Sequence, residues 1–226
     1  MENKKKRIFM CVSGVLICGI SVGFFKRAAF GVDPFQSFMA GLDALLPIEF
    51  GTLYVIANLC LLLFSLVADR HYIGLATVIN LSVLGYVAQF SHEFLLKQFP
   101  NLGVGGRILF LIVGIVIMCL ASSFYFMADL GVSTYDAVAL IIVNTWKIGK
   151  FGYVRVICDL VCVLMGIGLY LASGKAVSQI AAIVGVGTII TAFFMGPLIE
   201  FFNVHVSKPF LYGKNKKSLE KKVEIC

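Results

Sequence analysis

The stretch FGVDPFQSFMAGL, from Phe30 to Leu42, sets an acid, a proline and an amide inside a chain that is otherwise strongly apolar. One hundred positions later, LGVSTYDAVALII, from Leu130 to Ile142, repeats the arrangement. In each copy a glycine that permits a sharp turn precedes a residue, Asp33 or Ser133, that is favoured as a helix N-cap. The sequence therefore predicts two short helices that begin in the same way.

Both predicted helix starts carry a variant of the capping box. Gln36 and Asp136 stand three residues after the cap, from where a side chain can reach back to the cap's backbone N–H. Pro34 suits the first helical turn. The two segments, about 34–46 and 133–146, are apolar but shorter than the twenty or so residues that a spanning helix needs. We expect half-helices or helices lying in the interface, and whether they cross the membrane is left open.

The composition of the chain predicts an all-α, polytopic transmembrane bundle. The 226 residues are 60% hydrophobic and 14% charged, with a mean hydropathy of +0.96, whereas soluble domains carry about a quarter charged residues. Apolar segments long enough to cross a bilayer recur along the chain. The predicted spans are about 8–25, 51–68, 73–95, 108–128, 152–172 and 176–202.

The order of these segments predicts two repeats, 8–100 and 101–203, each with three spans and one short half-helix. Gly31 and Gly131 correspond at an offset of one hundred, and Asn58 and Asp159 at an offset of 101. An odd number of crossings per half makes the second copy inverted relative to the first, as in many secondary transporters. If the short segments cross the membrane as well, each half has four crossings and the repeats are parallel.

The net charge of +7 is confined to the two ends of the chain. The segment 1–7 and the segment 204–226 together hold ten bases and three acids, so the region between them is neutral. Basic ends on an apolar body follow the positive-inside rule and predict that both termini are cytoplasmic. They can also contact anionic lipids of the bilayer. No groove of aromatic and basic residues accompanies them, so we expect no nucleic-acid partner.

Polar residues inside predicted spans are the other candidates for function, because they are costly in lipid. Asp159 follows Arg155 by four residues, so the two can pair on one helix face. Asn58, at the equivalent place in the first half, could face Asp159 and share a proton or a polar ligand with it. Simpler roles, as helix caps and as a local ion pair, stay open for all of them. The candidate substrate-binding residues are Asp33, Gln36, Asn58, Ser133, Asp136 and Asp159.

The sequence shows no motif of a known catalytic or cofactor site. There is no Walker loop, dinucleotide-binding glycine pattern, HExxH motif or G-x-S-x-G nucleophile elbow. The seven cysteines lie in apolar segments or at the end of the chain, without neighbouring histidines. We therefore expect neither an enzyme nor a cofactor or metal site.

Two motifs carry a resemblance to a known family. MADLGVSTYDA, from Met127 to Ala137, and GTIITAFFMGPLIEFF, from Gly187 to Phe202, resemble the YczE-like bacterial membrane proteins, relatives of the YitT group. The first repeat departs from this pattern, with Ala29 where the second has Asp129 and Gln36 in place of an acid. The resemblance implies a multi-pass protein of the bacterial inner membrane, and it names no substrate.

The function that these patterns favour is a secondary permease for a small polar molecule. Asp33 and Asp136 would offset the positive ends of the two short helices, which favours a cationic, zwitterionic or neutral polar ligand over an anion. The alternative is a non-transporting membrane subunit or an accessory factor of a larger complex. A homo-oligomer or another membrane partner also stays open.

Overall fold

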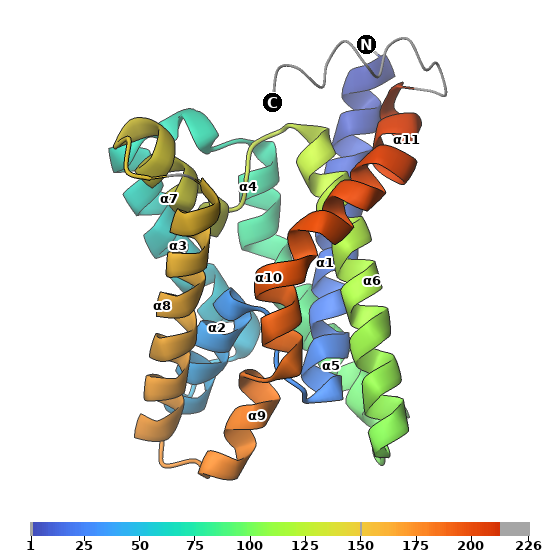
Figure 1. The fold of residues 1–226 in the computed structure, drawn as a ribbon, viewed down its shortest axis with the longest axis vertical. Coiled ribbons are helices and arrows are strands. Elements are labelled where there is room, and N and C mark those ends of the chain that lie inside the picture. The colour runs from blue at the N-terminus through green and yellow to red at the C-terminus, as the bar shows by residue number, and fades with distance from the viewer. Residues whose placement is uncertain (1, 150, 213–226) are drawn as a thin grey trace.

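The computed structural model describes residues 2–149 and 151–212, and this part of the chain is a bundle of helices without strands (Figure 1). The predicted all-α architecture is confirmed. The helices are α1 (Glu2–Ala28), α2 (Pro34–Leu45), α3 (Phe50–Ala68), α4 (Leu75–Ile79), α5 (Gly85–Gln98), α6 (Val104–Ala128), α7 (Thr134–Leu140), α8 (Phe151–Ala172), α9 (Ile180–Ile183), α10 (Val186–Phe202) and α11 (Lys208–Tyr212).

Wider helical turns join several of these helices into longer segments. The π-helical turns Asn80–Leu84 and Asn203–Ser207 connect α4 to α5 and α10 to α11, and Ile141–Thr145 extends α7. Short 3-10 turns at Arg70–Tyr72 and Val177–Gln179 precede α4 and α9. Each predicted span coincides with one helical segment, and the last is interrupted between α9 and α10.

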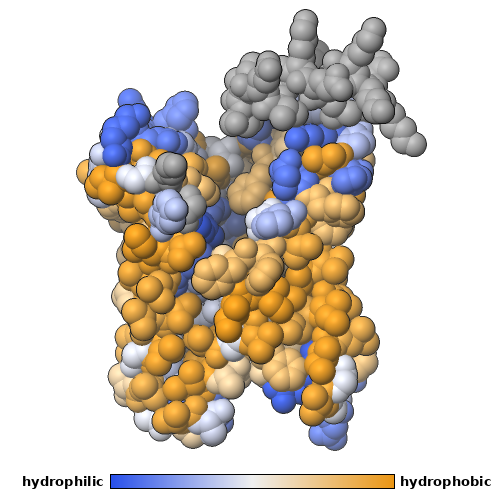
Figure 2. All heavy atoms as spheres, viewed as in Figure 1, coloured by the Kyte–Doolittle hydropathy of each residue, from blue (hydrophilic) through white to orange (hydrophobic). Residues whose placement is uncertain are grey.

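Five helical segments of the described chain are long and apolar enough to cross a membrane. They are Lys4–Ala28, Phe50–Ala68, Val104–Ala128, Tyr153–Ala172 and Val177–Tyr212. The α4–α5 segment, predicted as a further span, is not among them. Apolar side chains cover the middle of the bundle, and hydrophilic residues gather toward its two ends (Figure 2). This distribution is that of a helical membrane protein.

Helices α1 and α6 pack antiparallel along the centre of the bundle. A Cβ on Gly14 would lie 2.9 Å from the carbonyl oxygen of Ala121, and Gly114 faces Phe24 at the other end of the same contact. Small residues let helix backbones approach closely in this way. Midway between these points the Cys18 thiol lies 3.3 Å from the Met118 sulfur. Gly14 and Gly114, which are one hundred residues apart, therefore allow close packing at the two ends of the contact between α1 and α6.

The chain turns sharply after each of these two helices. Ala29 and Gly31 have φ values of +54° and +96°, and Asp129 and Gly131 have φ values of +52° and +104°. A positive φ is costly for residues with a side chain and natural for glycine. Both turns bring the chain back into the bundle, where a short helix begins.

Each turn is held by the opposite half of the chain. The turn after α1 pairs with the interruption between α9 and α10, and the turn after α6 pairs with the residues that precede and begin α4. These contacts are reciprocal, so neither half is a separate folding unit. The backbone hydrogen bonds are Val32 N to Ile183 O (3.1 Å), Gly187 N to Phe30 O (2.8 Å), Val132 N to Tyr72 O (3.1 Å) and Ala76 N to Leu130 O (2.9 Å).

Two arginines, also one hundred residues apart, cap the ends of α1 and α6. Arg107 donates to the carbonyl oxygens of Ala28 (2.8 Å) and Ala29 (2.7 Å) at the end of α1. Arg7 donates to the carbonyl oxygen of Ala128 (2.9 Å) at the end of α6 and pairs with Asp129 (3.2 Å). A cation stabilises the carbonyl end of a helix.

The short helices α2 and α7 start inside the bundle and run to opposite ends of it (Figure 1). Both are shorter than the segments that are long enough to cross a membrane. Helix α2 packs on α8 of the other half, where Gly41 and Gly166 allow the backbones to touch. Helix α7 packs on α3, and at its outer end Thr145 donates to Asp69 (2.7 Å) and lowers the pKa of that exposed carboxyl.

The basic start of the sequence lies at the same end of the bundle as helix α11. The stretch Lys4 to Arg7 belongs to α1, which begins at the end where α11 finishes (Figure 1). Residues 204–212, predicted as the start of a tail, continue the helix that begins in α10. The rest of the predicted C-terminal tail, 213–226, lies outside the described residues.

Candidate functional site

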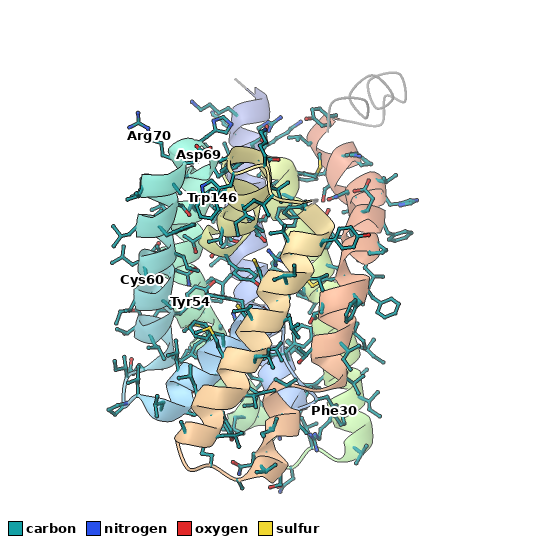
Figure 3. All side chains as sticks on the ribbon, turned by 60° about the vertical axis from the view of Figure 1, so that its left-hand side comes forward. Phe30, Tyr54, Cys60, Asp69, Arg70 and Trp146 are labelled. Carbon is teal, nitrogen blue, oxygen red and sulfur yellow. The ribbon has the colours of Figure 1, made fainter. Side chains whose placement is uncertain are left out.

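A cavity of about 420 Å³ lies at the centre of the described bundle, between the starts of the two short helices. Figure 2 shows a hollow with hydrophilic residues between the sides formed by α8 and α10. Tyr54 projects from α3 toward the middle of the bundle, whereas Asp69, Arg70 and Trp146 lie near one end (Figure 3). The structure brings all six candidate residues to this one cavity: Asp33, Gln36, Asn58, Ser133, Asp136 and Asp159.

The predicted N-caps of both short helices are confirmed. Asp33 Oδ1 accepts from the backbone N–H of Gln36 (3.2 Å), and Ser133 Oγ accepts from that of Asp136 (3.0 Å). The other predicted bond of the capping box, from the side chain at the third position back to the backbone N–H of the cap, is wrong for both helices. Asp136 Oδ2 instead accepts from the Ser133 hydroxyl (2.6 Å), and Gln36 makes no return bond. The side chains at the third position are therefore turned to the cavity rather than used for capping.

The first turns of the two short helices stack on each other. The rings of Phe35 and Tyr135, again one hundred residues apart, are nearly parallel with centroids 5.0 Å apart. Tyr54 packs edge-on against Phe35 at 5.9 Å. The apolar stack fixes the distance between the two helix starts and places Asp33 and Ser133 around the same space.

On the side of the cavity formed by α7 and α8, ion pairs and hydrogen bonds connect the polar lining residues. Arg155 binds Asp136, and its Nε lies 3.4 Å from Asp159 Oδ1, which confirms the predicted pair at positions i and i+4. The guanidinium also lies over the Tyr135 ring, 4.4 Å from its centroid. The Tyr135 hydroxyl donates to Asp159 (2.6 Å). Arg155 is therefore held on three sides, which makes it a fixed part of the site.

Asn58 and Asp159 do not bind each other, contrary to the idea that they share a proton directly. Thr134 donates to Asn58 Oδ1 (2.5 Å), and Asn58 Nδ2 donates to the carbonyl oxygen of Tyr54 (2.8 Å). Asp159 accepts from Tyr135, as described above. The equivalent residues of the two halves thus each bind the first turn of α7. Their common role in this structure is to hold that turn in place.

Two buried polar atoms at the cavity have no hydrogen-bond partner. Gln36, only 3% exposed, has an unpaired Oε1, and Tyr125, 6% exposed, has an unpaired hydroxyl. Both residues line the cavity. An unsatisfied polar group in a buried place costs about 1–3 kcal/mol. Such groups are expected where a ligand or ordered water completes the structure.

The cavity is open toward one end of the bundle. Its lining includes Phe126, near the end of α6, and Phe151, at the start of α8, and both are about two-fifths exposed. The end of α6 is the end of the bundle at which Arg7 of α1 lies. Toward the other end the lining residues Val22 and Phe35 are buried. Phe193 and Gly196 of α10 also line the cavity and are exposed, so its lining reaches the surface along the side of the bundle as well.

Sequence reasoning missed the aromatic part of this site. Tyr135 lies within the second motif, one hundred residues after Phe35. This correspondence could have indicated that the two rings meet at the paired helix starts. Tyr54 and Tyr125 lie in apolar spans, where nothing in the sequence separates a cavity residue from a packing residue. Arg155 was predicted only as a partner of Asp159, because its contact with Asp136 joins two different helices.

The fold and the cavity together define a class: a helical membrane protein in which two interrupted segments, one from each half, meet at a central polar cavity. The chain belongs to a family of unknown function, DUF6198, whose model matches residues 5–204. No curated protein and no solved structure matches the chain. The family thus covers the whole described bundle up to α10 without naming an activity.

Proposed function

We propose that the protein is a secondary permease for a small polar molecule, built from two inverted repeats. The observation that carries this proposal is the meeting of the α2 and α7 starts at one cavity. Irregular backbone at membrane depth is tolerated where it is buried in protein or lines an aqueous cavity, and transporters bind substrates at such interruptions. The contrast between an open end and a closed end fits a protein that exposes its site to one side at a time.

The reciprocal contacts support the inverted repeat. Arg7 and Arg107 cap opposite helices, and the two positive-φ turns dock on the opposite halves at equivalent places. The antiparallel packing of α1 and α6, which correspond in the predicted repeats, is in line with this proposal. The relation to the YczE-like and YitT groups is part of the same proposal, because the family match names neither.

The proposed location is the bacterial inner membrane with both termini in the cytoplasm. Lys4, Lys5, Lys6 and Arg7 lie at the end of the bundle where α11 finishes, which the positive-inside rule assigns to the cytoplasm. The cavity opens toward this end.

The test is transport by purified protein in proteoliposomes, screened against pools of small polar metabolites. Asp136→Asn and Asp159→Asn remove the carboxylates that hold Arg155, and we expect a transport rate at least tenfold lower for each. Asp129→Asn is the matched control, because the Asp129 side chain is 85% exposed and is not part of the cavity lining. A substrate that both cavity variants carry at the wild-type rate would overturn the site. Co-purification of a stoichiometric partner with no transport by the chain alone would favour the accessory-subunit alternative.

A further inference from the structure

The charges that line the cavity do not balance. Its acidic lining residues are Asp33, Asp136 and Asp159, and its one basic lining residue among those described is Arg155. Arg155 is taken up by Asp136 and Asp159. The cavity wall therefore carries more carboxylates than its own cation can neutralise.

Asp33 is the carboxylate without a counter-charge. No ion pair joins it to a basic group in residues 2–149 and 151–212, and its side chain is held by the backbone N–H groups of Gln36 and Phe35. A carboxylate in the interior of a membrane protein is costly unless it is paired. These backbone N–H groups carry no net charge, so they do not balance the negative charge of Asp33.

Gln36 supplies an independent observation at the same helix start. Its side-chain oxygen is buried, lines the cavity and lacks a donor. A water molecule could satisfy this oxygen, but it would not balance the charge of Asp33. A ligand that carries both a positive charge and several N–H groups would satisfy both residues at once.

Aromatic faces complete the environment that a cation requires. Phe35, Tyr54 and Tyr135 line the cavity beside Asp33. The negative face of an aromatic ring attracts an ammonium or guanidinium group, and the attraction grows when the site excludes water. Among the described residues there is no group of three or more His, Cys, Asp or Glu side chains that could hold a metal ion.

We propose that the ligand of this cavity is a small organic cation with N–H donors, an alkylammonium or an alkylguanidinium, held by Asp33 and the Gln36 side-chain oxygen beside the rings of Phe35 and Tyr54. This inference rests on the proposed function, since it names the substrate class of the same site. A cavity of about 420 Å³ falls within the range of small-molecule sites, roughly 300–1,000 Å³.

The first experiment measures binding to the purified full-length chain in detergent by isothermal calorimetry. Four probes of similar size differ only in their head group: n-butylammonium, n-butylguanidinium, n-butanol and butyrate. We expect the two cations to bind at least tenfold more tightly than butanol, and butyrate to bind least. Equal affinity for butanol, tighter binding of butyrate, or no binding of either cation at the limit of solubility would overturn the inference.

The second arm locates the cation. Asp33→Asn removes the charge but keeps a good N-cap, so α2 should still form. Its matched control is Asp43→Asn, the same substitution at an exposed position of α2 outside the cavity lining. We expect at least tenfold weaker binding of n-butylammonium by the Asp33 variant and unchanged binding by the Asp43 variant. Equal binding by the two variants would refute the assignment of Asp33.

The same probes separate this inference from the permease proposal. If the cations bind through Asp33 but proteoliposomes do not accumulate them, the ligand class stands and the transport function is wrong. If an anionic or neutral substrate is transported and Asp136→Asn abolishes the transport, the permease proposal stands and the cation inference is wrong. Binding of Na⁺ alone, measured with the same variants, would also overturn the organic cation.

Discussion

Alanine in place of Gly31 or Gly131 should damage the fold more than any other glycine-to-alanine change in the turns. A β-carbon on Gly31 would lie 2.9 Å from the Gly185 Cα and nearer still to its backbone nitrogen, and one on Gly131 would lie 2.6 Å from the Gly74 nitrogen. These neighbours are backbone atoms in the opposite half, so they cannot rotate away.

The magnitude follows from two losses at each turn. A side chain at such a positive φ costs roughly 1–2 kcal/mol. Relieving the overlap would pull the turn from its partner and break two backbone hydrogen bonds, each contributing about 1 kcal/mol. For Gly31 these are the bonds of Val32 to Ile183 and of Gly187 to Phe30. We expect each variant to lose about 3–4 kcal/mol of unfolding free energy.

The assay is thermal unfolding in detergent, followed by tryptophan fluorescence and by the monodisperse fraction left after heating. Gly168→Ala is the control, because a β-carbon there meets no other atom within 4 Å and lies in helix α8, where alanine is the better helix former. The control should be as stable as the parent or slightly more stable. If Gly31→Ala and Gly131→Ala unfolded at the parent temperature, the docking of each turn on the opposite half would be wrong.

Three further predictions concern single residues. Ala29→Gly should raise the unfolding free energy by about 0.5–1 kcal/mol in the same assay, because Ala29 has a φ of +54°, and an unchanged or lower value would count against the turn geometry. Arg107→Met should lower it by about 2 kcal/mol through the loss of two hydrogen bonds to the end of α1, whereas Arg70→Met, at an exposed position, should change it little. Tyr135→Phe keeps the ring stack but removes the hydrogen bond to Asp159, so it should lower the unfolding free energy by about 1 kcal/mol and weaken n-butylammonium binding severalfold. Unchanged binding would contradict the proposed role.

The sequence allowed the individual elements to be predicted because their signals are local. The apolar lengths located the spans, and the polar residues at Asp33 and Ser133 located the starts of the short helices. The spacing of Arg155 and Asp159 predicted their contact, because residues four apart share a helix face. Each of these inferences depends on residues that are neighbours along the chain.

The arrangement of the elements could not be predicted to the same depth, because it depends on contacts between the halves. The turn at Gly31 contacts Gly185, so it joins segments more than 150 residues apart. No local sequence pattern predicts this contact. The capping-box prediction failed for Asp136 because Arg155 of α8 and the Ser133 hydroxyl bind its carboxylate, and it failed for Gln36 because this side chain lines the cavity with its oxygen unpaired. The sequence shows that Arg7 and Arg107 are one hundred residues apart. That each caps the end of the other half's first helix could be recognised only once the antiparallel pairing of α1 and α6 was known.

The measurement that tests the central claim most directly is a cross-link between the two short-helix starts. In a chain whose native cysteines have been replaced, Phe35→Cys and Tyr135→Cys are treated with a short bifunctional thiol reagent, and the loop between α5 and α6 is then cut by an inserted protease site. We predict that the two fragments stay joined, and that the pair Leu45→Cys and Thr145→Cys, at the outer ends of the same helices, does not join them. Fragments that separate for the first pair, although each cysteine reacts with a monofunctional reagent, would contradict the shared central site.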